Sequence, residues 1–237
     1  MTLLFEIKKG MTLILIGSFI SSCTSMNPYK KQLSDKIIPL RQNITVGNAH
    51  DLTIYMGGLS YLNFVGTDAS GCQNFISGTD RGPNGQGFKF LTNQGGQQVT
   101  VEGREFGVPD FVPRLLKLKA CGDNFEIVDQ ILLRKKNGQF LTGLPPRDGV
   151  RDGAPFGPKG EKLEFDLNGV DLESLAVDSK GHYWIGEEYL PALLEFDQKG
   201  YLIRRIAPHE SLSKEQSLSS NTELLLPVEL NHRMMNR

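Results

Sequence analysis

Apolar residues recur along the chain in short runs that polar turns separate. Eight runs have the length and composition of β-strands: 61–65, 72–77, 112–119, 124–133, 172–178, 182–187, 192–197 and 201–206. Beyond the N-terminal segment, no run keeps the i, i+3, i+4, i+7 spacing of an amphipathic helix for long enough to predict one. The pattern therefore predicts an all-β chain.

The turns between these runs support the same fold class. Asp178–Gly181 and Asp197–Gly200 share the form Asp-x-x-Gly, and Lys136–Gly138 contains an Asn-Gly pair. Glycine accepts the positive φ that closes many hairpins, and aspartate can bond the backbone of its own turn. The 26 glycines and 12 prolines of this 237-residue chain fit a fold with many tight turns.

Two stretches of the chain present their strands in the same order. The stretch 57–132 and the stretch 170–206 each offer an apolar strand, an aromatic-rich strand ending in charge, an amphipathic strand and an outer strand. Four antiparallel strands make one blade of a β-propeller, so we expect an incomplete β-propeller of about three to four blades. A β-sandwich with two similar hairpins is the alternative.

Two long segments between the predicted strands, 77–97 and 142–162, are dense in glycine, proline and charge. Loops of this length in a compact domain are usually functional or disordered, so both are expected to be irregular. The segment 207–223 is expected to be a polar connection.

The N-terminus has the features of a targeting segment. Lys8 and Lys9 precede the apolar run 11–20, which is too short to span a bilayer of about 30 Å as a helix. The run leads into Ile-Ser-Ser before Cys23, which resembles the lipobox of bacterial lipoproteins, so Cys23 is the predicted lipidation site. A plain secretory signal is the alternative.

This interpretation divides the chain into a signal peptide at 1–22, a lipidated tether at 23–50 and a folded domain at 51–237. The anchor predicts a membrane-bound protein of the bacterial envelope, facing the periplasm or the cell surface. With Cys23 lipidated, Cys72 and Cys121 remain as a pair in an oxidising compartment. A disulfide between them is one expectation, and two buried thiols are the other.

Charge and motif content exclude several functions. The net charge is −1 and no basic stripe is interleaved with aromatic residues, which argues against a nucleic-acid partner. The segment around Ser60 lacks the second glycine of the G-x-S-x-G elbow, which disfavours serine-hydrolase chemistry. The four histidines show no metal-binding spacing, and His182 is interpreted as structural.

Acidic residues recur where the predicted strands end. Glu187 and Glu188 close the run 182–187, Asp80 has the parallel position in the first stretch, and Glu173 opens the neighbouring strand. Adjacent strand residues point to opposite faces, so we expect Glu188 at the mouth of the propeller channel and Glu187 against a neighbouring strand or loop. Carboxylates from several strands suit a hard cation such as Ca²⁺. Turn capping and pairing with arginines are the alternative.

Four arginines, Arg81, Arg114, Arg147 and Arg151, lie in or beside the long segments. An arginine cluster can hold phosphate or carboxylate groups bidentately. Solvated loop charge is the alternative, above all for Arg147 and Arg151.

Several motifs together resemble the bacterial phytase-like family, whose domain is named for the esterase-like activity of phytase. They are GGLS (57–60) leading to SGTDRGP (77–83), TGLP (142–145), DLESLAV (171–177) and WIGEEYLP (184–191). The resemblance runs from about residue 50 to the C-terminus. It implies an exported β-propeller that hydrolyses an ester or phosphoester.

The resemblance also assigns site residues. It implies that Asp80, Arg81, Glu173 and Glu188 belong to the site. With the acidic pattern above, we predict catalytic and metal-binding roles for Asp80, Glu173 and Glu188, and substrate-binding roles for Arg81 and Arg114. The chain departs from the family pattern at four positions: Tyr61 where a small residue is usual, Ser174 and Leu190 where glycine is usual, and Glu187 where aspartate is common.

The C-terminal segment 224–237 resembles one that normally continues into further blades, so an incomplete propeller that self-associates is expected. The sequence thus favours a lipid-anchored envelope protein that hydrolyses an ester or phosphoester with the help of a metal ion. A non-catalytic surface propeller that binds a ligand or a partner protein is the alternative.

Overall fold

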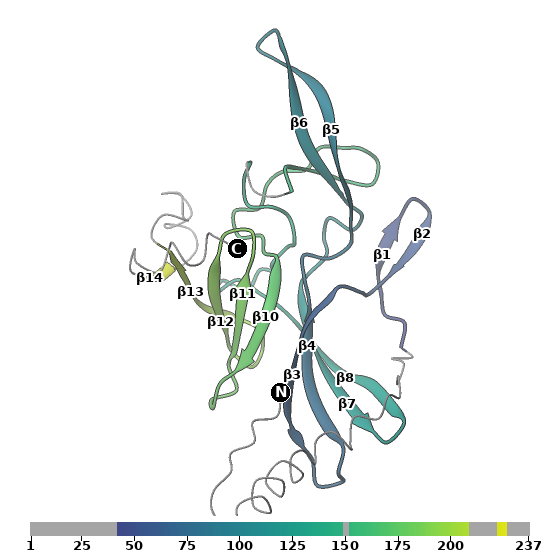
Figure 1. Ribbon diagram of the computed structural model, residues 1–237, viewed down its shortest axis with the longest axis vertical. Coiled ribbons are helices and arrows are strands. Elements are labelled where there is room, and N and C mark those ends of the chain that lie inside the picture. Colours follow the sequence, from purple (N-terminus) through teal and green to yellow (C-terminus); the bar gives the residue numbers. More distant parts are fainter. Residues whose placement is uncertain (1–41, 149–151, 209–221, 227–237) are drawn as a thin grey trace, which may run out of the picture. The chain divides into compact units, whose positions relative to one another are not determined.

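The computed structural model describes residues 42–148, 152–208 and 222–226. Every regular element assigned there is a β-strand, and these strands form four sheets of two, three, four and five strands (Figure 1). The predicted all-β class is confirmed for this part of the chain. The predicted signal peptide, the lipidation site Cys23 and Arg151 lie outside the described residues. Within them, no helix is long and apolar enough to cross a membrane.

The two repeated stretches each form one antiparallel sheet. In the first sheet the order of neighbours is β3–β4–β7–β8, from β3 (Leu59–Thr67), β4 (Gln73–Thr79), β7 (Arg114–Cys121) and β8 (Asn124–Leu132). In the second it is β10–β11–β12–β13, from β10 (Leu172–Val177), β11 (Tyr183–Glu187), β12 (Ala192–Phe196) and β13 (Leu202–Pro208). A fifth strand, β14 (Thr222–Leu226), pairs with β13 in parallel. The sequence pattern therefore located these eight antiparallel strands to within a few residues.

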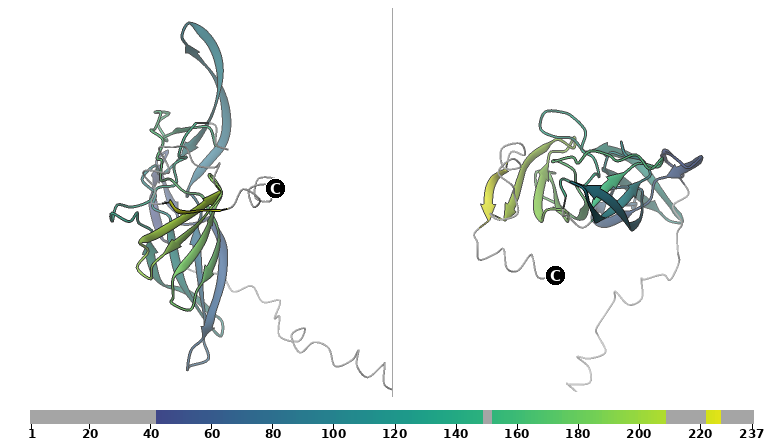
Figure 2. Two further views of the ribbon diagram at one scale, coloured as in Figure 1. Left: turned by 90° about the vertical axis from the view of Figure 1, so that its left-hand side faces the viewer. Right: turned by 90° about the horizontal axis from the view of Figure 1, so that it is seen from above.

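The segment 77–97, predicted to be irregular, is instead strand for most of its length. It contains the end of β4 and all of β5 (Asn84–Gln94), which pairs with β6 (Gln97–Phe106) in a hairpin that extends beyond the two large sheets (Figures 1 and 2). The turn uses Gly95 and Gly96, with φ of 60° and 84°, which is the glycine pair that a two-residue hairpin favours. The described side chains near the tip of this hairpin are mostly exposed, and such a ribbon needs no continuous apolar face, which is why its strands lacked the expected pattern.

Two shorter elements complete the described strands. β1 (Thr45–Ala49) and β2 (Leu52–Tyr55) form a hairpin at the boundary predicted between tether and domain. β9 (Ala154–Phe156) pairs in parallel with β6 and interrupts the segment 142–162, which is otherwise without strands where it is described. The segment 207–223 was predicted to be a polar connection, but its first two residues belong to β13 and its last two to β14.

One apolar cluster contains side chains from both large sheets. The first sheet contributes Tyr61, Ile76, Leu115 and Ile131, and the second contributes Leu172, Tyr183, Ile185, Leu194 and Phe196. Strand β11 shows the cause, because Tyr183, Ile185 and Glu187 are buried while Trp184 and Gly186 between them are only partly buried. The alternation turns one face of each sheet into the shared core. Packing of these faces brings the C-terminal end of β4 close to the start of β10.

Local bonds fix the turns, and a disulfide joins the two central strands of the first sheet at one end. Asp178 Oδ1 accepts hydrogen bonds from the backbone N–H groups of Lys180 and His182, at 2.8 and 2.9 Å, and Asp197 makes the equivalent pair in its own turn. A disulfide joins Cys72, which precedes β4, to Cys121 at the end of β7, across a sequence separation of 49 residues. Closing a loop of this size stabilises the folded state by about 4 kcal/mol in the chain-entropy account.

Candidate active site

The site lies where strands of both large sheets end. β4 ends at Thr79 and β11 ends at Glu187, while β10 begins opposite Glu187, at Leu172. The backbone N–H of Glu188 donates to the Asp171 carbonyl at 2.8 Å, and that of Arg81 donates to Asp171 Oδ1 at 3.3 Å. These bonds hold the residues that follow β4 and β11 on either side of Asp171.

Three carboxylates form what we call the acidic cluster: Asp171, Glu173 and Glu188. One oxygen from each lies within 4.8 Å of the others. Burial, followed by the charges of Glu188 and Asp80, raises the pKa of Glu173. Burial also raises the pKa of Asp171 to about 6, against the opposing effect of Arg81. The cluster thus holds negative charges close enough to repel one another.

Asp80 lies at the edge of the acidic cluster. Burial raises its pKa, while a hydrogen bond of 2.8 Å from the Gly82 N–H to Asp80 Oδ1 opposes the rise. Gly58 has a φ of 64°, and a Cβ there would lie 2.9 Å from Asp80 Oδ1, so only glycine allows this close approach without strain. The predicted residues Asp80, Glu173 and Glu188 are therefore brought together, with Asp171 as a fourth carboxylate.

Arg81 is held beside the cluster by two buried acids. Its guanidinium forms ion pairs with Asp171 and, at 3.3 Å, with Asp152 Oδ2. Burial lowers the pKa of Arg81, but the charges of Asp171 and Asp152 outweigh this effect and the pKa is raised. Arg81 Cζ also lies 5.9 Å from the ring centroid of Tyr189. Arg81 is therefore a permanent cation next to the acidic cluster.

Asp152 and Tyr189 are site residues that the sequence did not identify. The Asp152 side chain is fully buried, and its Oδ2 lies 3.0 Å from the Tyr189 hydroxyl, while its Oδ1 forms a 2.8 Å ion pair with Arg104 Nε. Burial, together with the charges of Asp152 and Asp171, raises the pKa of Tyr189, so this phenol stays protonated. Asp152 stands in a loop rich in charge, and nothing in its spacing distinguished it from solvated neighbours.

Glu187 has a different task from the adjacent Glu188. Its side chain is buried and accepts backbone hydrogen bonds from Asp171 at 3.2 Å, Tyr189 at 2.8 Å and Leu190 at 2.9 Å. Burial raises the pKa of Glu187 to about 7, although the buried Arg205 opposes the rise. Glu187 thus clamps the loop that positions Glu188, and it faces a neighbouring strand and loop as the alternation suggested.

Two further predicted arginines are described, Arg114 and Arg147, and the Arg114 backbone N–H donates to Thr79 Oγ1 at 3.1 Å, next to Asp80. Arg114 opens β7, where its Nε donates to the Val112 carbonyl at 3.1 Å and its guanidinium covers the Phe111 ring at 5.1 Å. A longer bond of 3.4 Å joins it to Gln130 on β8. Arg147 is exposed in the segment after β8. The contacts of Arg114 tie it to its own sheet.

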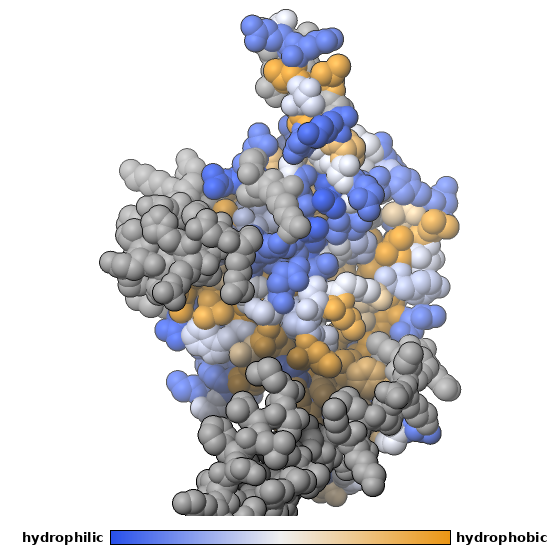
Figure 3. Space-filling view, viewed as in Figure 1, coloured by the Kyte–Doolittle hydropathy of each residue, from blue (hydrophilic) through white to orange (hydrophobic). Residues whose placement is uncertain are grey.

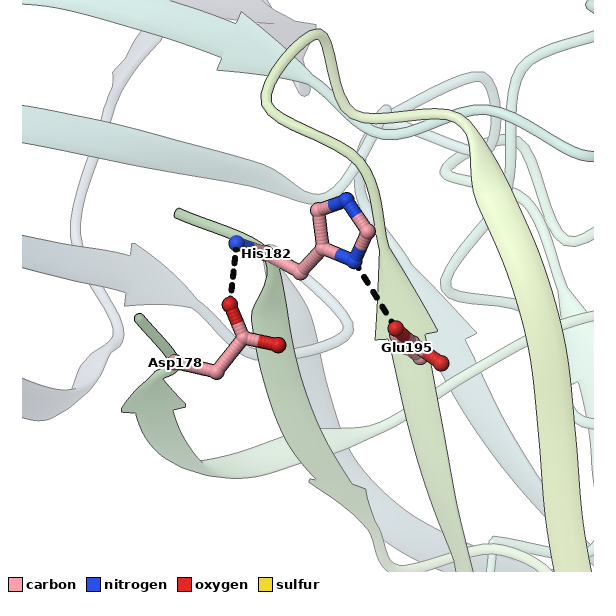
Figure 4. Close-up of side chains that lie close together, drawn as sticks. All are labelled: Asp178, His182 and Glu195. Atoms are coloured by element: carbon pink, nitrogen blue, oxygen red, sulfur yellow. Dashed lines mark hydrogen bonds and ion pairs between the residues drawn. The ribbon is translucent and has the colours of Figure 1, made fainter. Parts of the chain in front are cut away.

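A second group of potential ligands lies on the second sheet, formed by Asp178, His182 and Glu195 (Figure 4). His182 Nδ1 lies 2.8 Å from Glu195 Oε1, and Arg204 pairs with the other oxygen of Glu195. Asp178 Oδ2 accepts a 3.1 Å bond from the indole of Trp184. The hydrogen bond from the His182 backbone N–H, with smaller contributions from Trp184 and the Lys180 N–H, lowers the pKa of Asp178 and outweighs the opposing effect of burial. We call this group the histidine cluster.

The sequence profile of one protein family matches residues 57–224, which span both large sheets and the acidic cluster. That family is described as phytase-like, with esterase-like activity of phytase. The chain belongs to the phytase-like family. No curated protein and no solved structure matches the chain. The matched region contains Asp80, Glu173 and Glu188 but begins after the β1–β2 hairpin.

Proposed function

We propose that this phytase-like protein is a metal-assisted hydrolase of ester or phosphoester bonds, with the acidic cluster as its centre. The observation that carries the proposal is the convergence of Asp171, Glu173 and Glu188 within 4.8 Å, beside the cation Arg81. Membership of the phytase-like family fits a hydrolase. Groups with raised pKa values that gather at strand ends are typical of functional sites.

The donor set fits a hard divalent cation such as Ca²⁺. Calcium prefers six to eight oxygen ligands, and carboxylates are its strongest protein donors. Glu173 and Glu188 are exposed, so they can accept an ion from solvent, whereas Asp171 is buried and already shared with Arg81. Glu173 and Glu188 would hold the ion with Asp80 or Asp171. A bound cation would polarise the ester oxygen and lower the pKa of bound water.

The chain's own residues supply orientation and proton transfer. The raised pKa of Asp80 suits a general base or acid near neutral pH better than an ordinary aspartate would. Arg81 supplies positive charge beside the reacting group, and Asp152 with Tyr189 fixes its position. Glu187 keeps Glu188 in place by accepting hydrogen bonds from the backbone N–H groups of Tyr189, the next residue, and of Asp171.

Hydrolysis of 4-nitrophenyl phosphate and 4-nitrophenyl carboxylates, with Ca²⁺ and with a chelator, tests the proposal. We expect turnover that requires Ca²⁺ and falls by about 100-fold or more in Glu173→Gln and Glu188→Gln, because each removes a charged ligand. Asp178→Asn, the matched carboxylate change in the histidine cluster, is the control and should retain activity. Turnover no higher in the parent than in Glu188→Gln would instead favour a non-catalytic ligand-binding protein.

The propeller architecture and the lipid anchor belong to the same proposal. Two sheets that share a core, and that each contain four antiparallel strands, support two neighbouring blades of a propeller. Anchoring at Cys23 places the enzyme at a membrane of the bacterial envelope. Cys23→Ser should move the protein from the membrane fraction to the soluble fraction of the envelope. An unchanged membrane fraction would contradict the anchor.

A further inference from the structure

A pocket of about 270 Å³ opens beside Asp80, outside the acidic cluster. Its apolar lining comes from the β1–β2 hairpin and from the loops after β4 and before β7: Val46, Ile54, Met56, Pro83 and Phe111. Figure 3 shows apolar side chains gathered over this hairpin. Asp80 belongs to the wall of the pocket and also lies close enough to Glu173 to raise its pKa. The pocket and the acidic cluster therefore meet at one carboxylate.

Two glycines give the pocket its shape. A Cβ at Gly82 would lie 2.2 Å from Phe111 Cδ1, so the glycine lets this buried ring form the wall. A Cβ at Gly58 would lie 2.9 Å from Asp80 Oδ1. Both residues have positive φ, at 94° and 64°, which side chains other than glycine rarely adopt. The local sequence thus holds both Asp80 and Phe111 against the backbone that lines the pocket.

Most of the polar lining is already engaged within the chain. Asn84 Nδ2 donates to the Gly82 carbonyl at 2.9 Å, and Asn84 Oδ1 accepts from Arg104 at 3.0 Å. A ligand in this pocket meets several apolar side chains and the Asp80 carboxylate. Pockets that combine an apolar lining with few convergent polar groups are typical of small-molecule sites.

We propose that this pocket binds the apolar group of the ester substrate, so that the protein acts on amphiphilic esters carrying a medium-length alkyl group. The inference rests on the proposed function, because it places the ester bond at Asp80 and the acidic cluster. An apolar cavity of about 150 Å³ holds one benzene molecule, so this larger pocket accommodates an alkyl chain of about six to ten carbon atoms.

Chain-length series of n-alkyl acetates and n-alkyl phosphates, from two to twelve carbons, test the inference with the full-length protein. Calorimetry with Ca²⁺ present measures binding, and release of the alcohol measures turnover. Each buried methylene should tighten binding by about fourfold until the pocket is full, after which affinity should level off. The acetate and phosphate series show which of the two head groups the site accepts.

Two substitutions in the hairpin should shift the preferred chain length in opposite directions. Val46→Phe narrows the pocket and should move the plateau to shorter chains, whereas Ile54→Ala enlarges it and should move the plateau to longer ones. An unfolded protein cannot prefer longer alkyl chains. A shift to longer chains in Ile54→Ala therefore cannot be explained by loss of folding. Leu52→Ala changes an exposed residue of the same hairpin outside the pocket and should leave the series unchanged.

The outcomes separate this inference from the proposed function. If binding depends on chain length and shifts in the two variants, but no ester is turned over, the pocket binds the alkyl group and the proposed hydrolase activity is contradicted. Turnover of short esters with no dependence on chain length in the parent supports the hydrolase and overturns the pocket. Affinity that rises with length but is identical in Val46→Phe and Ile54→Ala places the alkyl group elsewhere and also overturns the inference.

Discussion

The acidic cluster and the histidine cluster each bring three ligating side chains within 4.8 Å, yet their electrostatics are opposite. In the acidic cluster, burial and neighbouring carboxylates raise the pKa values of Asp171 and Glu173. In the histidine cluster, hydrogen bonds from His182 and Trp184 lower the pKa of Asp178. Similar spacing of ligands therefore does not imply a similar function.

The difference comes from what surrounds each set of oxygens. Glu195 has a histidine on one oxygen and Arg204 on the other, and Asp178 bonds backbone N–H groups and an indole. A cation would have to displace these partners. In the acidic cluster, the exposed Glu173 and Glu188 repel each other, so a cation would relieve an existing electrostatic cost. The histidine cluster stabilises a turn, and the acidic cluster is suited to bind.

The largest expected effect that separates the clusters is on thermal stability with Ca²⁺. A ligand that binds only the folded state stabilises it by about 2.7 kcal/mol at 100 times its dissociation constant, which corresponds to a rise in melting temperature of about 5–10 °C for a domain of this size. Glu173→Gln and Glu188→Gln should lose most of this rise, because each removes one charged ligand. Differential scanning fluorimetry measures it.

The control for this measurement is Asp178→Asn, which should keep the full rise. A rise lost equally in Asp178→Asn and Glu173→Gln would show that Ca²⁺ binds at the histidine cluster or at neither cluster specifically. If Ca²⁺ does not raise the melting temperature of the parent protein, the proposed Ca²⁺ site is contradicted.

A smaller effect is expected on stability without metal. Glu195→Gln should lower the free energy of unfolding by about 1–3 kcal/mol, because it breaks a buried carboxylate's pairs with His182 and Arg204. Glu173→Gln should change it by less than about 0.5 kcal/mol, or raise it, because it removes repulsion from an exposed site. Urea unfolding with a chelator compares the two. Equal losses would contradict the contrast between the clusters.

The smallest effect is on the pH dependence of stability, and its sign differs between the clusters. The folded-state pKa of Glu173 is raised above 4.5, so the stability it contributes at low pH is lost as the pH rises through that pKa. The folded-state pKa of Asp178 is lowered below 3.8, so its contribution is lost as the pH falls through that pKa.

Urea unfolding between pH 3 and pH 8 measures this dependence for the parent, Glu173→Gln and Asp178→Asn. Relative to Glu173→Gln, the parent should become less stable as the pH rises. Relative to Asp178→Asn, it should become less stable as the pH falls. Two slopes of the same sign would show that the carboxylates share one kind of environment.

Strands of the two large sheets could be predicted where apolar residues recur at every second position, as in β11. β11 and β12 each place apolar side chains in the shared core, and such a face leaves a period of two in the sequence. The β5–β6 hairpin was missed because an exposed ribbon is stabilised chiefly by bonds between its own strands. Its only local signal was the Gly95–Gly96 turn.

The sequence also predicted part of the candidate site. Asp80, Glu173 and Glu188 stand at strand ends, and sequence position alone shows that. The proximity of Asp171 and Arg81, 90 residues apart in sequence, and the burial of Asp152 depend on how the two sheets pack. No spacing along the chain encodes a contact across that distance.

The sequence by itself determined the β class, the Asp-x-x-Gly turns and the positions of acidic residues at strand ends, because each depends on residues that are neighbours in the chain. Only the tertiary structure decided that Asp171 joins the acidic cluster, that the buried Asp152 pairs with Arg81, and that His182 pairs with Glu195. Burial and the approach of distant charges set these roles, since both depend on which faces of the two sheets meet.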